Sequence, residues 1–174
     1  ESGRSGIGRD GFGRAPASLQ GQFEAPFGPM GPPTLFTLPV LRYMKNYGMS
    51  HEQLAMVAVV QREWASKNPR ASFQDLITVD DVLESKLIAY PFHLLECCLV
   101  TDGGGALILT LNNRAKDFPQ KPVFILGCGE SVETPMISQM EDLTSSRAFR
   151  VAGPAAMQEA GVKHSDVDHL MVYD

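Results

Sequence analysis

The chain has 174 residues, which is the size of one ordinary domain or of part of a larger one. Hydrophobic residues make up 44% of it, enough to build a core, and this excludes wholesale disorder. The net charge of −5 argues against a protein that works mainly through the phosphate backbone of nucleic acids. No apolar run approaches the roughly 18–20 residues that a membrane-spanning helix needs.

The three cysteines form no recognisable metal or disulfide pattern. Cys97 and Cys98 are adjacent, and neighbours in sequence rarely meet disulfide geometry, while Cys128 stands alone. The chain has no CxxC pair, and its four histidines lack the spacing of metal ligands. We therefore expect a reduced, cytoplasmic protein that binds no metal and no resident cofactor.

Residues 1–33 are rich in glycine and proline, so they cannot hold a regular helix or strand for long. One interpretation is a flexible tail. However, Phe12, Phe23, Phe27 and Met30 are more apolar than a linker needs, and an ordered loop packed on a larger body is the other interpretation.

Two helices are predicted next. Apolar spacing favours a helix that begins near Thr34 and ends at Gly48, a natural C-terminal stop. Ser50 begins a second helix, and Gln53 completes a capping box with it. That helix ends before Asn68 and is apolar nearly all round, so we expect it to be buried.

The remainder is predicted to contain one short helix, several strands and one longer helix. Thr78 caps the short helix, which ends at Leu83. Apolar runs predict strands at 94–101, 106–111, 122–127 and 168–173. The longer helix, 147–160, is closed by Gly161. These strands are too few for a sheet covered on both faces, so we expect partner strands outside this chain and an end at Asp174 that is cut rather than finished.

The sharpest local motif is the glycine run that follows Asp102. Its three glycines allow positive φ angles or a close approach of another backbone, but the run is neither a P-loop nor a dinucleotide fingerprint. Cys97 or Cys98 could be a nucleophile, although a buried, inert cysteine is the simpler interpretation. Tyr173 ends an apolar strand, where a tyrosine usually packs and hydrogen-bonds.

Several segments together resemble the thiolase superfamily, and most closely its sterol carrier protein X and lipid-transfer-protein branch. The segments are Tyr43–Gly48, Asn68–Asp75, Val79–Lys86, Cys97–Ala106 and Asp166–Asp174. They occur in the family's order, and the similarity runs from about Leu38 to Asp174. Residues 1–33 match only loosely.

The resemblance implies an α/β fold with the layered αβαβα arrangement of thiolases, of which this chain holds the loop domain and parts of both halves. On that map, residues 1–93 form the loop domain that covers the active site. Residues 94–116 hold the last strand of the N-terminal half, and residues 117–174 open the C-terminal half.

The resemblance also implies site residues. Cys98 and Leu99 match positions beside the pantetheine arm of coenzyme A, and Tyr173 matches a catalytic position. The family's nucleophilic cysteine, its second cysteine and its Gly-His-Pro histidine match nothing in this chain. The glycines from Asp102 to Ala106 are then expected to let strands pack closely.

Three functions follow from the resemblance. The first is a segment of an acyltransferase that makes or breaks the carbon–carbon bond of a 3-ketoacyl-CoA in lipid metabolism. The second is a retro-aldolase acting on a steroid or other β-hydroxyacyl-CoA, with Tyr173 as acid/base and a small OB-fold protein as partner. The third is a non-catalytic module that binds acyl-CoA. A homodimer is expected, and the segment alone is expected to be inactive.

Overall fold

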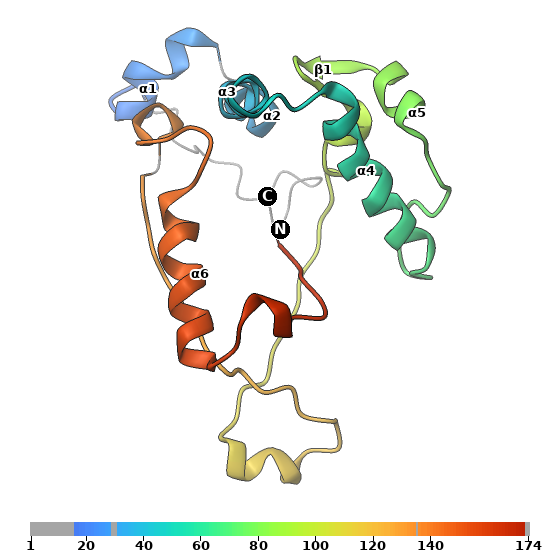
Figure 1. Cartoon of the computed structure of the whole chain (residues 1–174), viewed down its shortest axis with the longest axis vertical. Coiled ribbons are helices and arrows are strands. Elements are labelled where there is room, and N and C mark those ends of the chain that lie inside the picture. Colours follow the sequence, from blue (N-terminus) through green and yellow to red (C-terminus); the bar gives the residue numbers. More distant parts are fainter. Residues whose placement is uncertain (1–15, 29–30, 135, 173–174) are drawn as a thin grey trace. The chain divides into compact units, whose positions relative to one another are not determined.

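The computed structural model describes residues 16–28, 31–134 and 136–172, and it divides into two compact units (Figure 1). The first unit comprises Glu1–Gly103 and Pro135–Thr144, and the second comprises Gly104–Thr134 and Ser145–Asp174. The helices are α1 (Leu19–Phe23), α2 (Pro32–Leu35), α3 (Thr37–Tyr47), α4 (His51–Ser66), α5 (Val79–Glu84) and α6 (Arg147–Ala160). The strands are β1 (Leu87–Ala89) and β2 (Phe92–His93), which pair antiparallel.

The predicted end of α3 and the predicted bounds of α4 are confirmed, whereas α3 begins at Thr37 rather than near Thr34, because a separate short helix, α2, occupies Pro32–Leu35. Gly48 ends α3 with a left-handed φ of 68°, a conformation that glycine adopts without a steric penalty. The Ser50 hydroxyl accepts a hydrogen bond from the Gln53 amide at 3.3 Å, and the Ser50 amide donates to Gln53 Oε1 at 2.8 Å. This reciprocal pair is the predicted capping box, and it satisfies two backbone amides that a helix start leaves unpaired.

Helix α5 is also capped as predicted, and it forms the small core of the first unit with α4. The Thr78 hydroxyl accepts a hydrogen bond from the Asp81 amide at 3.1 Å. Helix α4 packs against α5 and against the 3-10 turn η2 (Leu94–Glu96). Ala55 of α4 and Val82 of α5 are fully buried.

The expectation that α4 is buried all round is wrong for the part of the chain that the structure describes. Ala55 is the helix's buried residue, whereas Met56, Val57 and Trp64 are 46%, 58% and 62% exposed. One face of α4 meets α5 and η2, and the described residues do not cover the others.

The glycine- and proline-rich beginning of the chain contains more regular structure than predicted. Helix α1 forms because the Ser18 hydroxyl caps it, accepting a hydrogen bond from the Gly21 amide at 3.0 Å. The following residue, Glu24, is only 7% exposed, and its Oε1 accepts a hydrogen bond from the Ser138 amide at 3.0 Å. This contact joins segments 114 residues apart within the first unit, which supports the interpretation of an ordered loop at residues 18–24.

Glu24 makes the stability of the first unit depend on pH. Burial alone raises the pKa of Glu24, but hydrogen bonds from Ser138 and Gln20 outweigh burial and hold the pKa below its ordinary value of 4.5. A depressed carboxyl pKa stabilises the folded state above the ordinary pKa, and this contribution is lost as the pH falls through the lowered value. We expect Glu24→Gln to lower the melting temperature at pH 7, with the difference from the unmodified protein shrinking below about pH 4.5. Thermal melting of both proteins from pH 7 to pH 3 tests this. If their difference in melting temperature did not change with pH, the charge of Glu24 would have no such role.

In the second unit, residues 127–133 run along helix α6 (Figure 1). An added Cβ at Gly127 would lie 2.6 Å from the Ala160 nitrogen, near the end of α6. At the other end, Glu133 Oε2 accepts a hydrogen bond from the Arg147 amide at 2.8 Å. A carboxylate at a helix N-terminus is favourable because the amides and the helix dipole are positive there. Gly161 closes α6 with a φ of 68°, as predicted.

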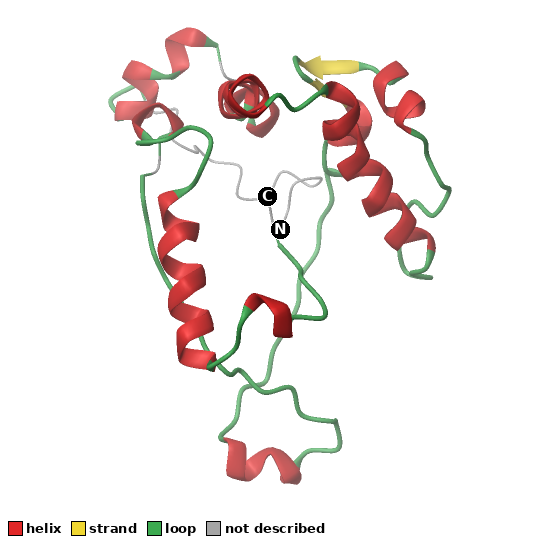
Figure 2. Ribbon diagram, viewed as in Figure 1, coloured by secondary structure: helices red, strands yellow, loops and turns green. Residues whose placement is uncertain are grey.

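The four predicted strands are not strands in the structure, where the described residues of these segments run as loop apart from the η2 turn (Figure 2). Their apolar side chains are exposed: Leu107 is 91%, Val123 94% and Met171 97% accessible. A strand needs a neighbour that accepts and donates its backbone hydrogen bonds, and no described segment supplies one here. The apolar patterns are present in the sequence, but a segment becomes a strand only when a second segment pairs with it.

Candidate acyl-CoA site

The segment Cys97–Leu99 is positioned by the β1–β2 hairpin and the turn η2. The Leu94 amide donates to the Lys86 carbonyl at 2.8 Å, which ties the start of η2 to the start of the hairpin. At the other end of the turn, the Cys97 amide donates to the Leu94 carbonyl at 3.2 Å. The backbone around Cys97 is thus fixed by local hydrogen bonds.

His93 and Glu96 brace the same turn. The His93 amide donates to Glu96 Oε2 at 2.6 Å, and the His93 ring nitrogen Nδ1 lies 3.3 Å from the same oxygen. Both side chains are largely buried, with 17% and 6% of their areas exposed. His93 therefore has a structural partner rather than a free ring, and its position favours support of the turn over ligand binding.

Cys97 is not poised as a nucleophile. Its thiol points back into the turn and donates to the His93 carbonyl at 3.4 Å. Burial, together with the neighbouring Glu96 carboxylate and the Cys98 thiol, raises the pKa of Cys97. A raised pKa keeps the thiol protonated near neutral pH, and the reactive form of cysteine is the thiolate.

The third cysteine, Cys128, is held at helix α6. Its amide donates to Glu159 Oε2 at 2.8 Å, and its sulfur lies 3.5 Å from the same oxygen. The hydrogen bond to Glu159 and the charge of that carboxylate raise the pKa of Cys128. Cys128 is therefore also a protonated thiol near neutral pH, although its side chain is exposed.

The candidate binding residues Cys98 and Leu99 are accessible, as a substrate contact requires. Cys98 is exposed and Leu99 is 49% exposed, directly after the fixed turn. The glycines that follow have open space around them: nothing lies within 4 Å of a Cβ added at Gly103, Gly104 or Gly105. The close packing expected there is instead found at Gly127 and Gly129.

Tyr173, the candidate catalytic residue, lies outside the described residues. His164 and His169 are exposed near the end of the described chain. Within the described residues, no group of three or more His, Cys, Asp or Glu side chains is placed to hold a metal ion. In the same part of the chain, no helix is both long enough and apolar enough to span a membrane.

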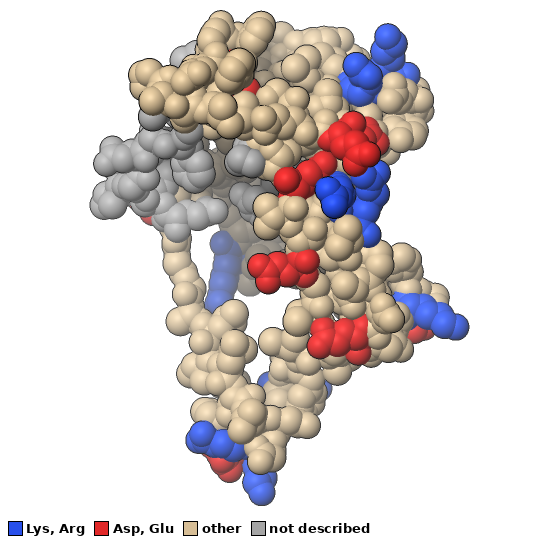
Figure 3. All heavy atoms as spheres, turned by 90° about the vertical axis from the view of Figure 1, so that its left-hand side faces the viewer, with Lys and Arg blue, Asp and Glu red and all other residues tan. Residues whose placement is uncertain are grey.

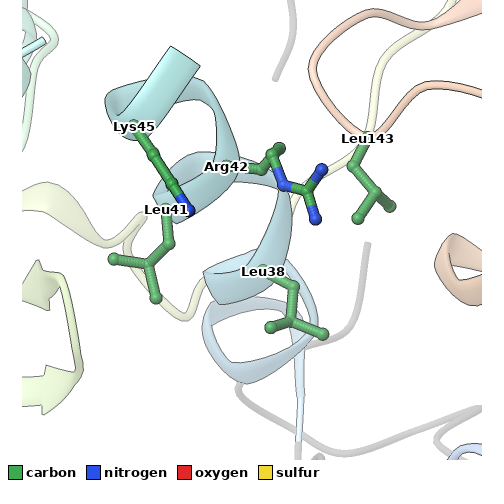
Figure 4. A pocket seen from close by; sticks show the side chains of 5 residues that line it. All are labelled: Leu38, Leu41, Arg42, Lys45 and Leu143. Carbon is green, nitrogen blue, oxygen red and sulfur yellow. The ribbon is translucent and has the colours of Figure 1, made fainter. Parts of the chain in front are cut away.

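Sequence reasoning missed a pocket of about 240 Å³ on α3, within the first unit. It is lined by Leu38, Leu41, Arg42, Lys45 and Leu143 (Figure 4). The α3 members follow an i, i+3, i+4, i+7 pattern, which places them on one helix face. That spacing was visible in the sequence, but the contribution of Leu143 from about 100 residues further on was not.

Comparison with known proteins identifies the family. Residues 129–174 match the model of the "Thiolase C-terminal domain-like" family. The chain is 34% identical to the acetyl-CoA acetyltransferase of Methanothermobacter thermautotrophicus over 82% of its length, and 34% identical to the steroid side-chain-cleaving aldolase of Thermomonospora curvata over 98%. These matches confirm the predicted resemblance to the thiolase superfamily, and the chain is similar to a segment of such proteins.

The structure is likewise similar to a solved one. The structure described as "Ltp2-ChsH2(DUF35) aldolase" superimposes with a TM-score of 0.68 at 29% identity, over 82% of this chain and 39% of that chain. The α/β fold class predicted from sequence is therefore confirmed. The chain spans 37% and 46% of the acetyltransferase and the steroid aldolase, less than half of each.

Proposed function

We propose that these residues belong to an acyl-CoA enzyme that makes or breaks the carbon–carbon bond of a 3-ketoacyl-CoA. The observation that carries the proposal is the 34% identity to an acetyl-CoA acetyltransferase, which extends over 82% of the chain. In this reaction a cysteine thiolate attacks the ketone carbon, the carbon–carbon bond breaks, and the leaving enolate is protonated. Coenzyme A then removes the acyl group from the cysteine.

We assign the nucleophile to a part of the polypeptide outside these 174 residues. The raised pKa values of Cys97 and Cys128 support this assignment, because neither thiol is activated. We further propose that Cys98 and Leu99 line the channel for the pantetheine arm, and their exposure beside a fixed turn supports such a contact. The coenzyme A thioester is the substrate, and no metal takes part.

The domain layout that we propose has a loop domain at 1–93, the last strand of the N-terminal half at 94–116 and the start of the C-terminal half at 117–174. The match of residues 129–174 to a C-terminal domain model supports the last boundary. The exposed apolar segments at 106–111 and 122–126 support the view that their partner strands lie in the rest of the polypeptide. We propose a homodimer in the cytoplasm, and the three free cysteines support the reducing compartment.

A second function, retro-aldol cleavage of a β-hydroxyacyl-CoA, has its own support. The steroid side-chain-cleaving aldolase matches 98% of the chain at 34% identity, and the similar solved structure is an aldolase. In this reaction Tyr173 removes the proton of the β-hydroxyl, the carbon–carbon bond breaks, and the enolate of the thioester is protonated. Such an enzyme needs no cysteine nucleophile, and we propose a small OB-fold protein as its partner.

One experiment separates these functions. The complete polypeptide that contains these residues is incubated with acetoacetyl-CoA, with and without free coenzyme A, and separately with a β-hydroxyacyl-CoA. We expect cleavage of the ketoacyl thioester that requires free coenzyme A. Cleavage of the hydroxyacyl thioester without free coenzyme A would instead establish the aldolase. Tight binding of coenzyme A thioesters with no turnover would establish a non-catalytic module, and full turnover by the 174 residues alone would overturn our view of them as an incomplete segment.

A further inference from the structure

The pocket on α3 combines two cations with an apolar wall. Leu38 and Leu41 supply apolar surface from the first half of the helix, and Leu143 adds to it from the segment Pro135–Thr144. Arg42 and Lys45 follow on the same helix face. The Arg42 side chain extends from α3 toward Leu143 (Figure 4).

Neither cation has an anionic partner among the described residues. The ion pairs found there are Lys67–Glu63, His93–Glu96 and Arg114–Asp117. Lys45 lies in the last turn of α3, where a positive charge favours the negative end of the helix dipole. The interaction with the helix dipole falls off within one turn of the helix end. It therefore does not explain the position of Arg42 in the pocket beside Leu38 and Leu41.

On the face of the molecule in Figure 3, Lys and Arg side chains are interspersed with Asp and Glu rather than gathered into one basic field. The overall charge of −5 also opposes general attraction of anions. An anion that binds here is therefore held by Arg42 and Lys45 themselves, which are three residues apart and so about 5–6 Å apart at their Cβ atoms.

The pocket is a small, open hollow of about 240 Å³, with room for part of a ligand. Sites that enclose a whole drug-sized ligand are larger, about 300–1,000 Å³. This pocket is suited to one charged group together with a small apolar group next to it.

We propose that the α3 pocket binds the diphosphate of a coenzyme A thioester together with the dimethyl group of the adjoining pantoyl unit. In coenzyme A the diphosphate is directly followed by a carbon that carries two methyl groups, so charge and apolar surface are adjacent as they are in the pocket. Arg42 and Lys45 donate hydrogen bonds to the phosphate oxygens, and Leu38, Leu41 and Leu143 contact the methyl groups. This inference rests on the proposed acyl-CoA substrate.

The test uses the complete polypeptide with Arg42→Ala and Lys45→Ala combined. We expect KM for the acyl-CoA substrate to rise about tenfold with kcat unchanged, because contacts remote from the reacting carbon stabilise substrate and transition state equally. The same substrate as an acyl-pantetheine thioester, which lacks the phosphates, should react equally well with both proteins. Added salt should weaken acyl-CoA binding by the unmodified protein more than by the variant.

The matched control is Arg70→Ala combined with Lys121→Ala, which removes two exposed positive charges outside the pocket. It should leave KM within about twofold of the unmodified value, because exposed charges away from the ligand contribute little. Equal KM changes in the two double variants would overturn the pocket assignment, as would an unchanged KM in the first. A protein that neither binds nor turns over any coenzyme A thioester would instead refute the proposed function, which is a separate result.

Discussion

Replacing Gly129 with alanine is expected to lower the free energy of unfolding by about 3 kcal/mol, because the added methyl group would enter the backbone of helix α6. A Cβ at this position lies 2.8 Å from the Ala152 carbonyl carbon and closer still to its oxygen. Backbone atoms cannot swing aside as a flexible side chain can, so the segment or the helix must shift. A shift would also strain the hydrogen bond from the Cys128 amide to Glu159.

The comparison variant is Gly153→Ala, in the interior of α6. Apart from its chain neighbours, nothing lies within 4 Å of a Cβ at Gly153, and the helix preference for alanine over glycine, up to about 1 kcal/mol, is opposed by the crowding of that Cβ against the ring of Pro154. The two variants add the same methyl group to the same unit, and Gly153→Ala should change the free energy of unfolding much less than Gly129→Ala does. Urea denaturation of each measures the difference, and equal midpoints would refute the close approach at Gly129.

The close contact at α6 also illustrates what the sequence made predictable. The bounds of α6 follow from local signals, namely its apolar spacing and the stop at Gly161, and the structure agrees with them. That Gly127 and Gly129 meet Ala152, Ala156 and Ala160 depends on how two separate segments pack. Nothing in either segment alone identifies the other as its partner.

The difference between local and long-range interactions also explains why the helices were predicted correctly and the strands were not. Helices α3 and α4 hold their hydrogen bonds within themselves, so caps such as Ser50 are enough to locate them. The segments 106–111 and 122–127 carry equally clear apolar patterns, yet a strand exists only with a hydrogen-bonded neighbour. The Glu24–Ser138 hydrogen bond was likewise invisible, because it joins residues 114 apart.

The candidate site was predictable only through the family resemblance. Composition and spacing favoured an inert role for the cysteines, and the protonated state of Cys97 and Cys128 agrees with that interpretation. Cys98 and Leu99 became candidate substrate contacts because their neighbours match a thiolase motif. Neither the residue spacing nor the family resemblance indicated the α3 pocket. Its lining includes Leu143, which lies about 100 residues after the α3 residues in the sequence.

Replacing Tyr173 with phenylalanine is expected to have the largest effect on catalysis of any single change in this chain. For cleavage of a β-hydroxyacyl-CoA we expect kcat to fall by roughly 10²- to 10⁴-fold, the usual contribution of a positioned acid/base group. For thiolysis of a 3-ketoacyl-CoA we expect only about a tenfold loss, because in the proposed reaction the Tyr173 hydroxyl would supply one hydrogen bond to water or to the thioester oxygen. Phenylalanine keeps the aromatic ring and removes only the hydroxyl.

Tyr47→Phe is the matched control, because Tyr47 is 63% exposed, contacts the Tyr43 ring in a tilted arrangement and has no hydrogen bond through its hydroxyl among the described residues. It should leave both rates within about twofold of the unmodified protein. Single-turnover rates of the complete polypeptide with each substrate measure the chemical step directly. A loss confined to the aldol reaction assigns proton transfer to Tyr173, and a tenfold loss in thiolysis assigns it a positioning role. If Tyr173→Phe matched Tyr47→Phe with both substrates, Tyr173 would have no part in the site, since a hydroxyl that touches the reacting atoms cannot be removed without changing the barrier.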